Sequence, residues 1–184
     1  MNTFREDLSE AAAYHGHICS GQIVGVRMAR LGLRLLGISD PKTFRELIVY
    51  VECDRCLTDA ISTVTGCKLG KRSLKWMDYG KSAATFLNLQ TGKALRIYRK
   101  THRYPPEGAE LIEFFESIPD SDMFSTELVH VHYDKTDLPG KPLDAIICSS
   151  CGEEVIDGRQ QQKDGVYMCR ACAFGSYYDR GAEI

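Results

Sequence analysis

Residues 15–21 read HGHICSG and place two imidazoles and a thiol within one short stretch. A second cysteine-bearing segment, residues 53–59, reads CDRCLTD. Imidazole and thiolate are good ligands for zinc and other late first-row metals, and together the two segments hold more of them than a structural core needs. We therefore expect the two segments to meet and to form a metal site or a reactive-thiol site.

Two helices are predicted on either side of the first segment. Apolar residues between positions 4 and 14 have helical spacing, with acidic residues in the first turn, where the helix dipole favours them. A second helix is predicted from residue 20 or 21 to residue 36, with Gly37 as its left-handed cap. Gly25 and Gly32 weaken this helix by about 1 kcal/mol each relative to alanine, but they can allow close packing against a partner helix. The HGHICSG stretch is thus the turn between two helices.

The rest of the chain up to residue 140 contains short strand and helix signals. Strands are predicted at residues 47–51, 83–89, 95–98 and 128–133, and helices after Asp54 and over residues 107–117. Helices first and strands later, without a repeating βα rhythm, indicate an α+β fold with N-terminal helices packed on a mostly antiparallel sheet. Residues 139–142, PGKP, predict a linker. We therefore place a core domain at residues 1–140 and a second domain at 141–184.

The second domain carries two C-x2-C pairs separated by residues 152–168, namely Cys148 with Cys151 and Cys169 with Cys172. This spacing is typical of a zinc-ribbon or zinc-finger module, in which four thiolates surround one tetrahedral ion. Disulfides, or iron held by the same thiolates, are the alternatives. About 40 residues bury too small a core to fold alone, so we expect a structural zinc to contribute much of the folding free energy.

Composition and charge limit the classes of function. The formal net charge of -2 gives no general attraction to nucleic acid or to an anionic membrane, so neither is an expected partner. No apolar run approaches the roughly 20 residues that span a bilayer, and the N-terminus lacks the apolar core of a signal peptide. We expect a cytoplasmic protein. Thiols stay reduced in that compartment, so the eight cysteines are better explained by metal binding or catalysis than by disulfides.

The core site is expected to be open. Cys19 and Cys56 are each predicted near a helix start, where free N–H groups and the helix dipole stabilise a thiolate and lower its pKa. A site of His17, Cys19 and Cys56 would leave a fourth position for water or substrate around a second zinc or another transition metal. Cys19, Cys56 and Asp59 are the candidate catalytic residues. Asp59 could act as a general base or as a partner behind the ligands, and His15 could orient a ligand.

Other interpretations of these residues stay open. Cys53 and Cys67 could be small buried apolar side chains, and Cys53 with Cys56 could form a thiol redox pair, although no thioredoxin-like pattern surrounds it. A basic run between residues 68 and 75 is of the kind that usually forms a solvated surface, though it could hold an anion.

These motifs together resemble the family of the formylmethanofuran dehydrogenase E-subunit, over nearly the whole chain. The resemblance is carried by HGHxCxG at residues 15–21, by Glu52 with CxxDA at 56–60, by TGCxLG at 65–70 and by DxGK at 78–81. It implies an α+β core, a homodimer and a metal-associated site. The family pattern usually has proline where this chain has Ser20, a residue that can still cap the helix.

Carried over residue by residue, the resemblance implies a site of His17, Cys19 and Cys56, with Asp59, Thr65 and Lys81 nearby. It does not imply formylmethanofuran oxidation, which needs a molybdenum or tungsten pterin and iron–sulfur clusters, because this chain has no ferredoxin-type cysteine run and is too short to enclose the pterin. We expect a metal-binding accessory protein whose partners are components of molybdenum or tungsten oxidoreductases. The alternatives are a zinc-finger module that contacts protein or nucleic acid, and a thiol oxidoreductase that uses Cys53 and Cys56.

Overall fold

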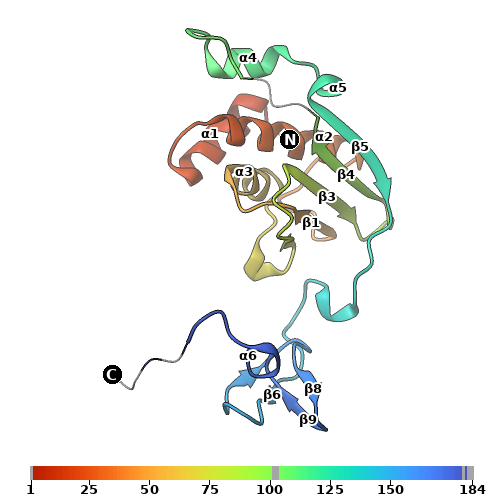
Figure 1. Cartoon of the computed structure of the whole chain (residues 1–184). Helices are drawn as coiled ribbons and strands as arrows, with labels where there is room; N and C mark the ends of the chain where they lie inside the picture. Colours follow the sequence, from red (N-terminus) through yellow and green to blue (C-terminus); the bar gives the residue numbers. More distant parts are fainter. Residues whose placement is uncertain (1, 101–103, 180, 182–184) are drawn as a thin grey trace. The chain divides into compact units, whose positions relative to one another are not determined.

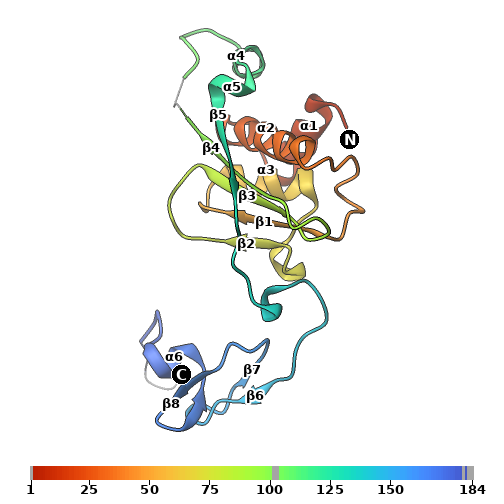
Figure 2. The same ribbon diagram turned by 90° about the vertical axis from the view of Figure 1, so that its right-hand side faces the viewer.

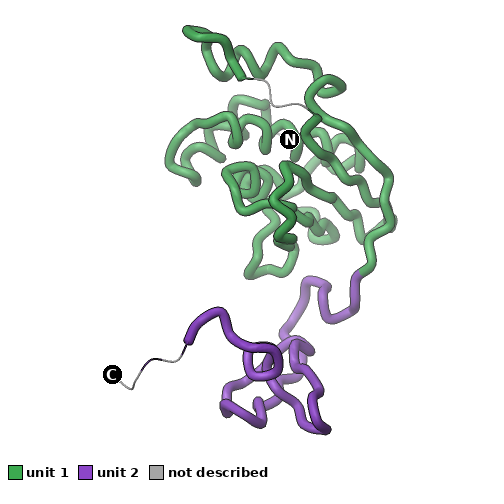
Figure 3. The backbone as a smooth tube through the Cα atoms, viewed as in Figure 1, with its two compact units in different colours: residues 1–132 green, residues 133–184 purple. Residues whose placement is uncertain are grey.

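The structure, a computed structural model, describes residues 2–100, 104–179 and 181. The chain divides into two compact units, residues 1–132 and 133–184 (Figure 3). The predicted linker at residues 139–142 follows a short 3-10 helix, η2 (Lys135–Asp137), inside the second unit. Within the described residues, no helix combines the length and the apolar character needed to cross a membrane.

The first unit begins with the two predicted helices, α1 (Phe4–His15) and α2 (Ser20–Leu35). Thr3 starts α1 in a capping box with Glu6, in which each side chain accepts a hydrogen bond from the other residue's backbone N–H. Gly16, with φ 98°, ends the helix. A sharp left-handed turn therefore leads straight into the HGHICSG stretch.

Two expected caps are wrong. The N-cap of α2 is Cys19, not Ser20, and it makes no side-chain capping hydrogen bond. The helix α3 (Cys56–Thr65) starts one residue later than predicted, with Arg55 rather than Asp54 as its N-cap, again without a side-chain bond. Both helix starts thus leave free backbone N–H groups near a cysteine.

The sheet of the first unit has five strands in the order β2-β1-β3-β4-β5 (Figures 1 and 2). They are β1 (Leu47–Val51), β2 (Leu74–Trp76), β3 (Ala83–Asn88), β4 (Ala94–Arg99) and β5 (Phe124–Val129). Only the β1–β2 pair is parallel, and the other three pairs are antiparallel. The predicted α+β fold with a mostly antiparallel sheet is therefore confirmed.

Two elements begin at residues other than those predicted. The last strand was expected at residues 128–133, but β5 ends at Val129 because its partner β4 starts at Ala94, directly opposite. The helix expected from residue 107 begins at Leu111 as α4 (Leu111–Ser117), and a short helix, α5 (Asp120–Met123), follows it. A 3-10 turn, η1 (Leu69–Lys71), lies between α3 and β2.

Helices α1, α2 and α3 cover one face of the sheet (Figure 1), and glycines let α2 approach its neighbours. A Cβ on Gly25 would lie 2.7 Å from both the Ala60 Cβ and the Leu57 carbonyl oxygen of α3. A Cβ on Gly32 would lie 2.8 Å from the fully buried Phe86 ring of β3. The expected close packing is therefore present twice, once against a helix and once against the sheet.

The second unit is built from very short elements. They are β6 (Ile146–Ile147), β7 (Glu154–Val155), β8 (Gln161–Lys163), β9 (Val166–Met168) and α6 (Arg170–Phe174). Strands β6 and β7 pair, and β8 and β9 form a second antiparallel pair joined by Asp164 and Gly165, both with positive φ. Among the described residues of this unit, the buried apolar side chains are Cys148, Val155 and Ala173. So small a core needs another source of stability.

Candidate metal centres

The first turns of α2 and α3 meet at Gly21. A Cβ at this position would lie 2.9 Å from the Cys56 Cβ and 3.7 Å from the sulfur atoms of both Cys19 and Cys56. A hydrogen bond joins the two thiols. Gly21 thus provides the space in which two cysteines from distant parts of the chain come together.

Two histidines stand beside this thiol pair. The metal-binding atoms of His15, His17 and Cys19 all lie within 4.8 Å of one another, and the two imidazole rings are tilted with their centroids 4.8 Å apart. Since Cys56 adjoins Cys19, two imidazoles and two thiols surround one small region. This donor set suits zinc and other late first-row metals.

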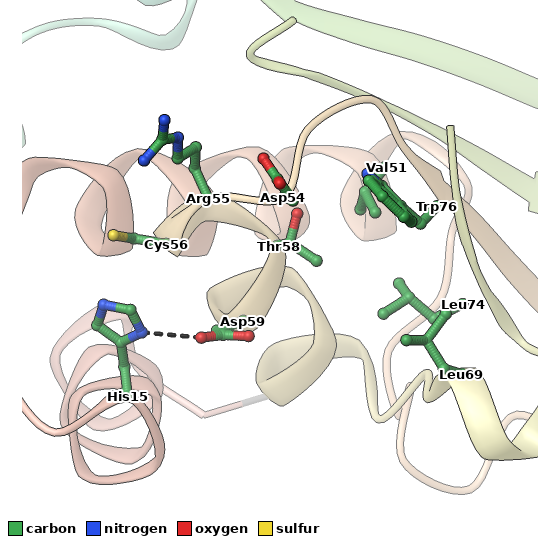
Figure 4. Close-up of a pocket in the computed structure, with 10 residues that line it drawn as sticks. All are labelled: His15, Val51, Asp54, Arg55, Cys56, Thr58, Asp59, Leu69, Leu74 and Trp76. Atoms are coloured by element: carbon green, nitrogen blue, oxygen red, sulfur yellow. Dashed lines mark hydrogen bonds and ion pairs between the residues drawn. The ribbon is translucent and has the colours of Figure 1, made fainter. Parts of the chain in front are cut away.

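Asp59 acts on the site through His15. Its Oδ2 lies 2.8 Å from His15 Nδ1, and the other ring nitrogen of His15 points toward the Cys56 sulfur (Figure 4). A carboxylate that fixes one imidazole nitrogen while the other faces a metal position is a common arrangement in metal sites. The structure therefore pairs Asp59 with an imidazole rather than leaving it free.

The pKa of Cys56 departs from the sequence-based expectation. Burial raises the pKa of this thiol, and the hydrogen bond and charge of Cys19 raise it further. The expected lowering by the helix start is wrong because desolvation and the neighbouring sulfur outweigh it. Two thiolates in contact repel each other, so a cation between them is what would allow both to ionise.

Sequence reasoning missed Gln22, which is fully buried in the first turn of α2. Its Nε2 donates a 2.7 Å hydrogen bond to the backbone carbonyl of Cys56 and so ties the start of α3 to α2. The only signal in the sequence is an amide directly before the apolar run of residues 23–26. Gln22 and Gly21 together hold the two cysteine-bearing turns in place.

Three other motif residues serve the fold. Thr65 lies at the far end of α3, roughly 13 Å along the axis from Cys56, and its hydroxyl donates to the Ile61 carbonyl. Glu52 is buried and accepts hydrogen bonds of 2.7 and 2.9 Å from Arg96, which joins β1 to β4. These side chains are engaged in contacts away from the thiol pair.

Lys81 and two of the remaining cysteines also lie in other surroundings. The Lys81 ammonium stands 5.8 Å from the centroid of the Tyr79 ring. Cys53 and Cys67 are both buried, and the Cys67 thiol donates to the Leu47 carbonyl. The latter pair fits the interpretation as small core side chains.

The second unit gathers its four cysteines. The sulfur atoms of Cys148, Cys151, Cys169 and Cys172 all lie within 4.8 Å of one another, so the cluster could hold a metal ion. Hydrogen bonds from the backbone N–H groups of Cys151, Cys169 and Ser150 lower the pKa of Cys148 to about 6. N–H donors that face a sulfur stabilise the thiolate form, which is the form that binds metal.

The first unit matches a known family. The family model described as "FmdE, Molybdenum formylmethanofuran dehydrogenase operon" matches residues 14–131, from the end of α1 through the last strand of the sheet. The chain belongs to the FmdE family. The resemblance found in the sequence motifs is thereby confirmed, and the matched region of this FmdE chain contains the whole histidine and cysteine cluster of the core.

Two similar proteins extend the comparison of the FmdE chain. A protein of Archaeoglobus fulgidus named "Probable S-adenosyl-L-methionine-binding protein" is 32% identical over 204 residues, which cover 93% of this chain but 53% of that protein, so the chain spans about half its length. An FmdE-like protein of tungsten formylmethanofuran dehydrogenase type from Syntrophus aciditrophicus has a TM-score of 0.61 at 20% identity, over 96% of this chain and 95% of the other. The second comparison supports the fold.

Proposed function

We propose that this FmdE protein is a metal-binding accessory protein whose core holds one transition-metal ion in an open site. His17, Cys19 and Cys56 are the proposed ligands, and His15 faces the remaining position with its ring held by Asp59. The observation that carries the proposal is the meeting of the two thiols and two imidazoles at the helix starts. The bound ion would act as a Lewis acid toward a ligand in its open position.

The chain's own residues would have distinct roles at this site. Cys19 and Cys56 would supply negative charge, and His17 a neutral nitrogen. The His15 ring, fixed by the 2.8 Å contact with Asp59, could accept a proton from a group in the open position through its other nitrogen. Gln22 and Gly21 would keep the two sulfur atoms at binding distance.

In the second unit we propose a structural zinc held by the four cysteines, with no open position. The association of the family with formylmethanofuran dehydrogenase supports a role beside the components of molybdenum or tungsten oxidoreductases, and we propose that the protein acts as a homodimer. A cytoplasmic location stays a prediction. So does the alternative in which the zinc module contacts protein or nucleic acid, which salt-dependent binding to DNA would favour.

Elemental analysis at known protein concentration tests the core site. We expect about two metal ions per chain for the natural protein and about one for a Cys19→Ser/Cys56→Ser variant with an unchanged circular dichroism spectrum. Cys53→Ser/Cys67→Ser is the matched control, because both side chains are buried thiols away from the cluster. It should keep both ions.

Two results would contradict this account. A folded Cys19→Ser/Cys56→Ser protein that retains its full metal content would remove the core site. One ion per chain in the natural protein would instead favour the thiol oxidoreductase that uses Cys53 and Cys56. His15→Gln should keep the ion, and its loss there would show that His15 is a fourth ligand and that the site is closed.

A second candidate function is binding of S-adenosylmethionine, the ligand in the name of the Archaeoglobus fulgidus relative. The observation that favours it is Trp76, which is 50% exposed beside a pocket next to Cys56, since an adenine ring can stack on an indole. Equilibrium dialysis of S-adenosylmethionine against the chain would test this function. Retention by the Cys19→Ser/Cys56→Ser variant would separate it from metal binding.

A further inference from the structure

A pocket with a volume of about 440 Å³ adjoins the cysteine and histidine cluster of the core. Cys56 and His15 stand at one end, and Trp76, Leu74 and Leu69 at the other (Figure 4). The volume falls within the range of about 300–1,000 Å³ that is typical of small-molecule sites. The pocket therefore has room for an organic ligand that reaches the proposed metal position.

The far end of the pocket is apolar and partly uncovered. Leu69 is 64% exposed and Trp76 is 50% exposed, while Leu74 below them is buried. An indole ring that lies half-open beside a cavity offers a flat face on which an aromatic ring can stack. This end favours a planar, largely apolar group.

A second cavity of about 620 Å³ shares Thr58, Asp59, Leu69 and Leu74 with the pocket. Its lining adds Lys68 and Lys71 at the turn η1. The basic run noted in the sequence thus borders the same region as the indole.

These two lysines differ from the third lysine of the same cavity. Lys42 forms an ion pair with Glu10, at 2.5 and 2.7 Å. Among the residues that the structure describes, neither Lys68 nor Lys71 forms an ion pair. Two uncompensated ammonium groups beside a cavity attract an anion.

We infer that the pocket and the adjoining cavity bind an organic anion with a flat aromatic or heteroaromatic ring. The ring lies against Trp76 and Leu69, and the anionic group lies near Lys68 and Lys71. The end nearest Cys56 and His15 faces the metal, and in this one respect the inference rests on the proposed function.

The sole tryptophan of the chain reports on the test directly, because Trp76 lies in the pocket itself. The probe is 2-naphthoate, a planar aromatic anion, titrated into the full metal-loaded chain. We expect a saturable change in tryptophan fluorescence with 2-naphthoate, about tenfold weaker binding of the uncharged 2-naphthamide, and no change with acetate. Equal binding of the naphthoate and the amide would overturn the anionic part, and no saturable response would overturn the site.

Charge-reversal variants locate the anion. Lys68→Glu/Lys71→Glu should weaken 2-naphthoate binding about tenfold, while Lys135→Glu/Lys141→Glu, exposed lysines of the second unit, should leave it unchanged. Equal weakening in both variants would contradict the inference. Trp76→Phe, measured by calorimetry, should keep most of the affinity, and Leu69→Ser should lose about tenfold.

The metal content of the same samples keeps this inference separate from the proposed function. Failure of 2-naphthoate to bind a chain that carries both ions would refute the pocket alone. Binding of 2-naphthoate by a chain without a core ion would refute the metal site alone. S-adenosylmethionine, which carries a net positive charge, is the last probe, and tighter binding of it than of 2-naphthoate would overturn the anionic assignment.

Discussion

A Cys151→Ser variant is expected to unfold residues 133–184 while residues 1–132 stay folded. The buried apolar side chains described in the second unit are Cys148, Val155 and Ala173, and its strands are two or three residues long. A core of that size cannot offset the loss of chain entropy. Binding of zinc by four thiolates contributes roughly 10–16 kcal/mol in comparable small modules, so loss of one ligand should remove the main source of stability.

Hydrogen exchange measured for the two units separately checks this expectation. Amides of residues 146–174 should lose protection in Cys151→Ser, and a strong chelator should have the same effect on the natural protein. Trp76 fluorescence should stay unchanged, because the only tryptophan belongs to the first unit. Ser149→Ala is the control, since it alters the same knuckle but leaves all four sulfur atoms. Protection of residues 146–174 without metal would contradict the proposed structural zinc.

The order of secondary structure could be predicted because it depends on local patterns. The apolar spacing of α1 and α2, the left-handed Gly16, and the β-rich residues 47–51 each act over a few neighbouring residues. The paired cysteines of the second unit are equally local. The ends of elements were harder to predict. Strand β5 stops at Val129 because its partner stops there, and that partner lies some thirty residues earlier in the chain.

The core cluster could be predicted only in part. The sequence indicated which thiols and imidazoles take part, because soft ligands are rare enough to stand out. It did not reveal the pairing of Asp59 with His15, nor the buried amide of Gln22 on the Cys56 carbonyl. Both contacts join α3 to residues more than thirty positions away, and they depend on how closely α2 and α3 pack.

The raised pKa of Cys56 has the same origin. A helix start lowers the pKa of a thiol, and that effect can be read from sequence. Burial and the approach of Cys19 oppose it and win, but they exist only once the two helices have packed. The sequence therefore predicts the ligands of the candidate site better than their protonation.

Replacing Gly25 with valine should lower the free energy of unfolding of the first unit by about 3 kcal/mol, the upper end of the usual cost of overpacking. A Cβ at this position would lie 2.7 Å from the Leu57 carbonyl oxygen, 2.7 Å from the Ala60 Cβ and 3.0 Å from the Leu57 Cα. Two of these three atoms belong to the backbone, so the clash cannot be relieved by a side-chain rotation. The gain in helix propensity relative to glycine is below about 1 kcal/mol, and overpacking outweighs it.

The same substitution should weaken the core metal site without touching any ligand. To relieve the clash, α2 must move away from α3, and this movement separates the Cys19 sulfur from the Cys56 sulfur. Urea unfolding followed by Trp76 fluorescence measures the stability, and metal analysis of the folded fraction measures the site. Gly70→Val is the matched control, because a Cβ there meets nothing within 4 Å and its backbone is not left-handed. Equal stability of the two variants, or full core metal content in folded Gly25→Val, would show that close contact between α2 and α3 is not what assembles the site.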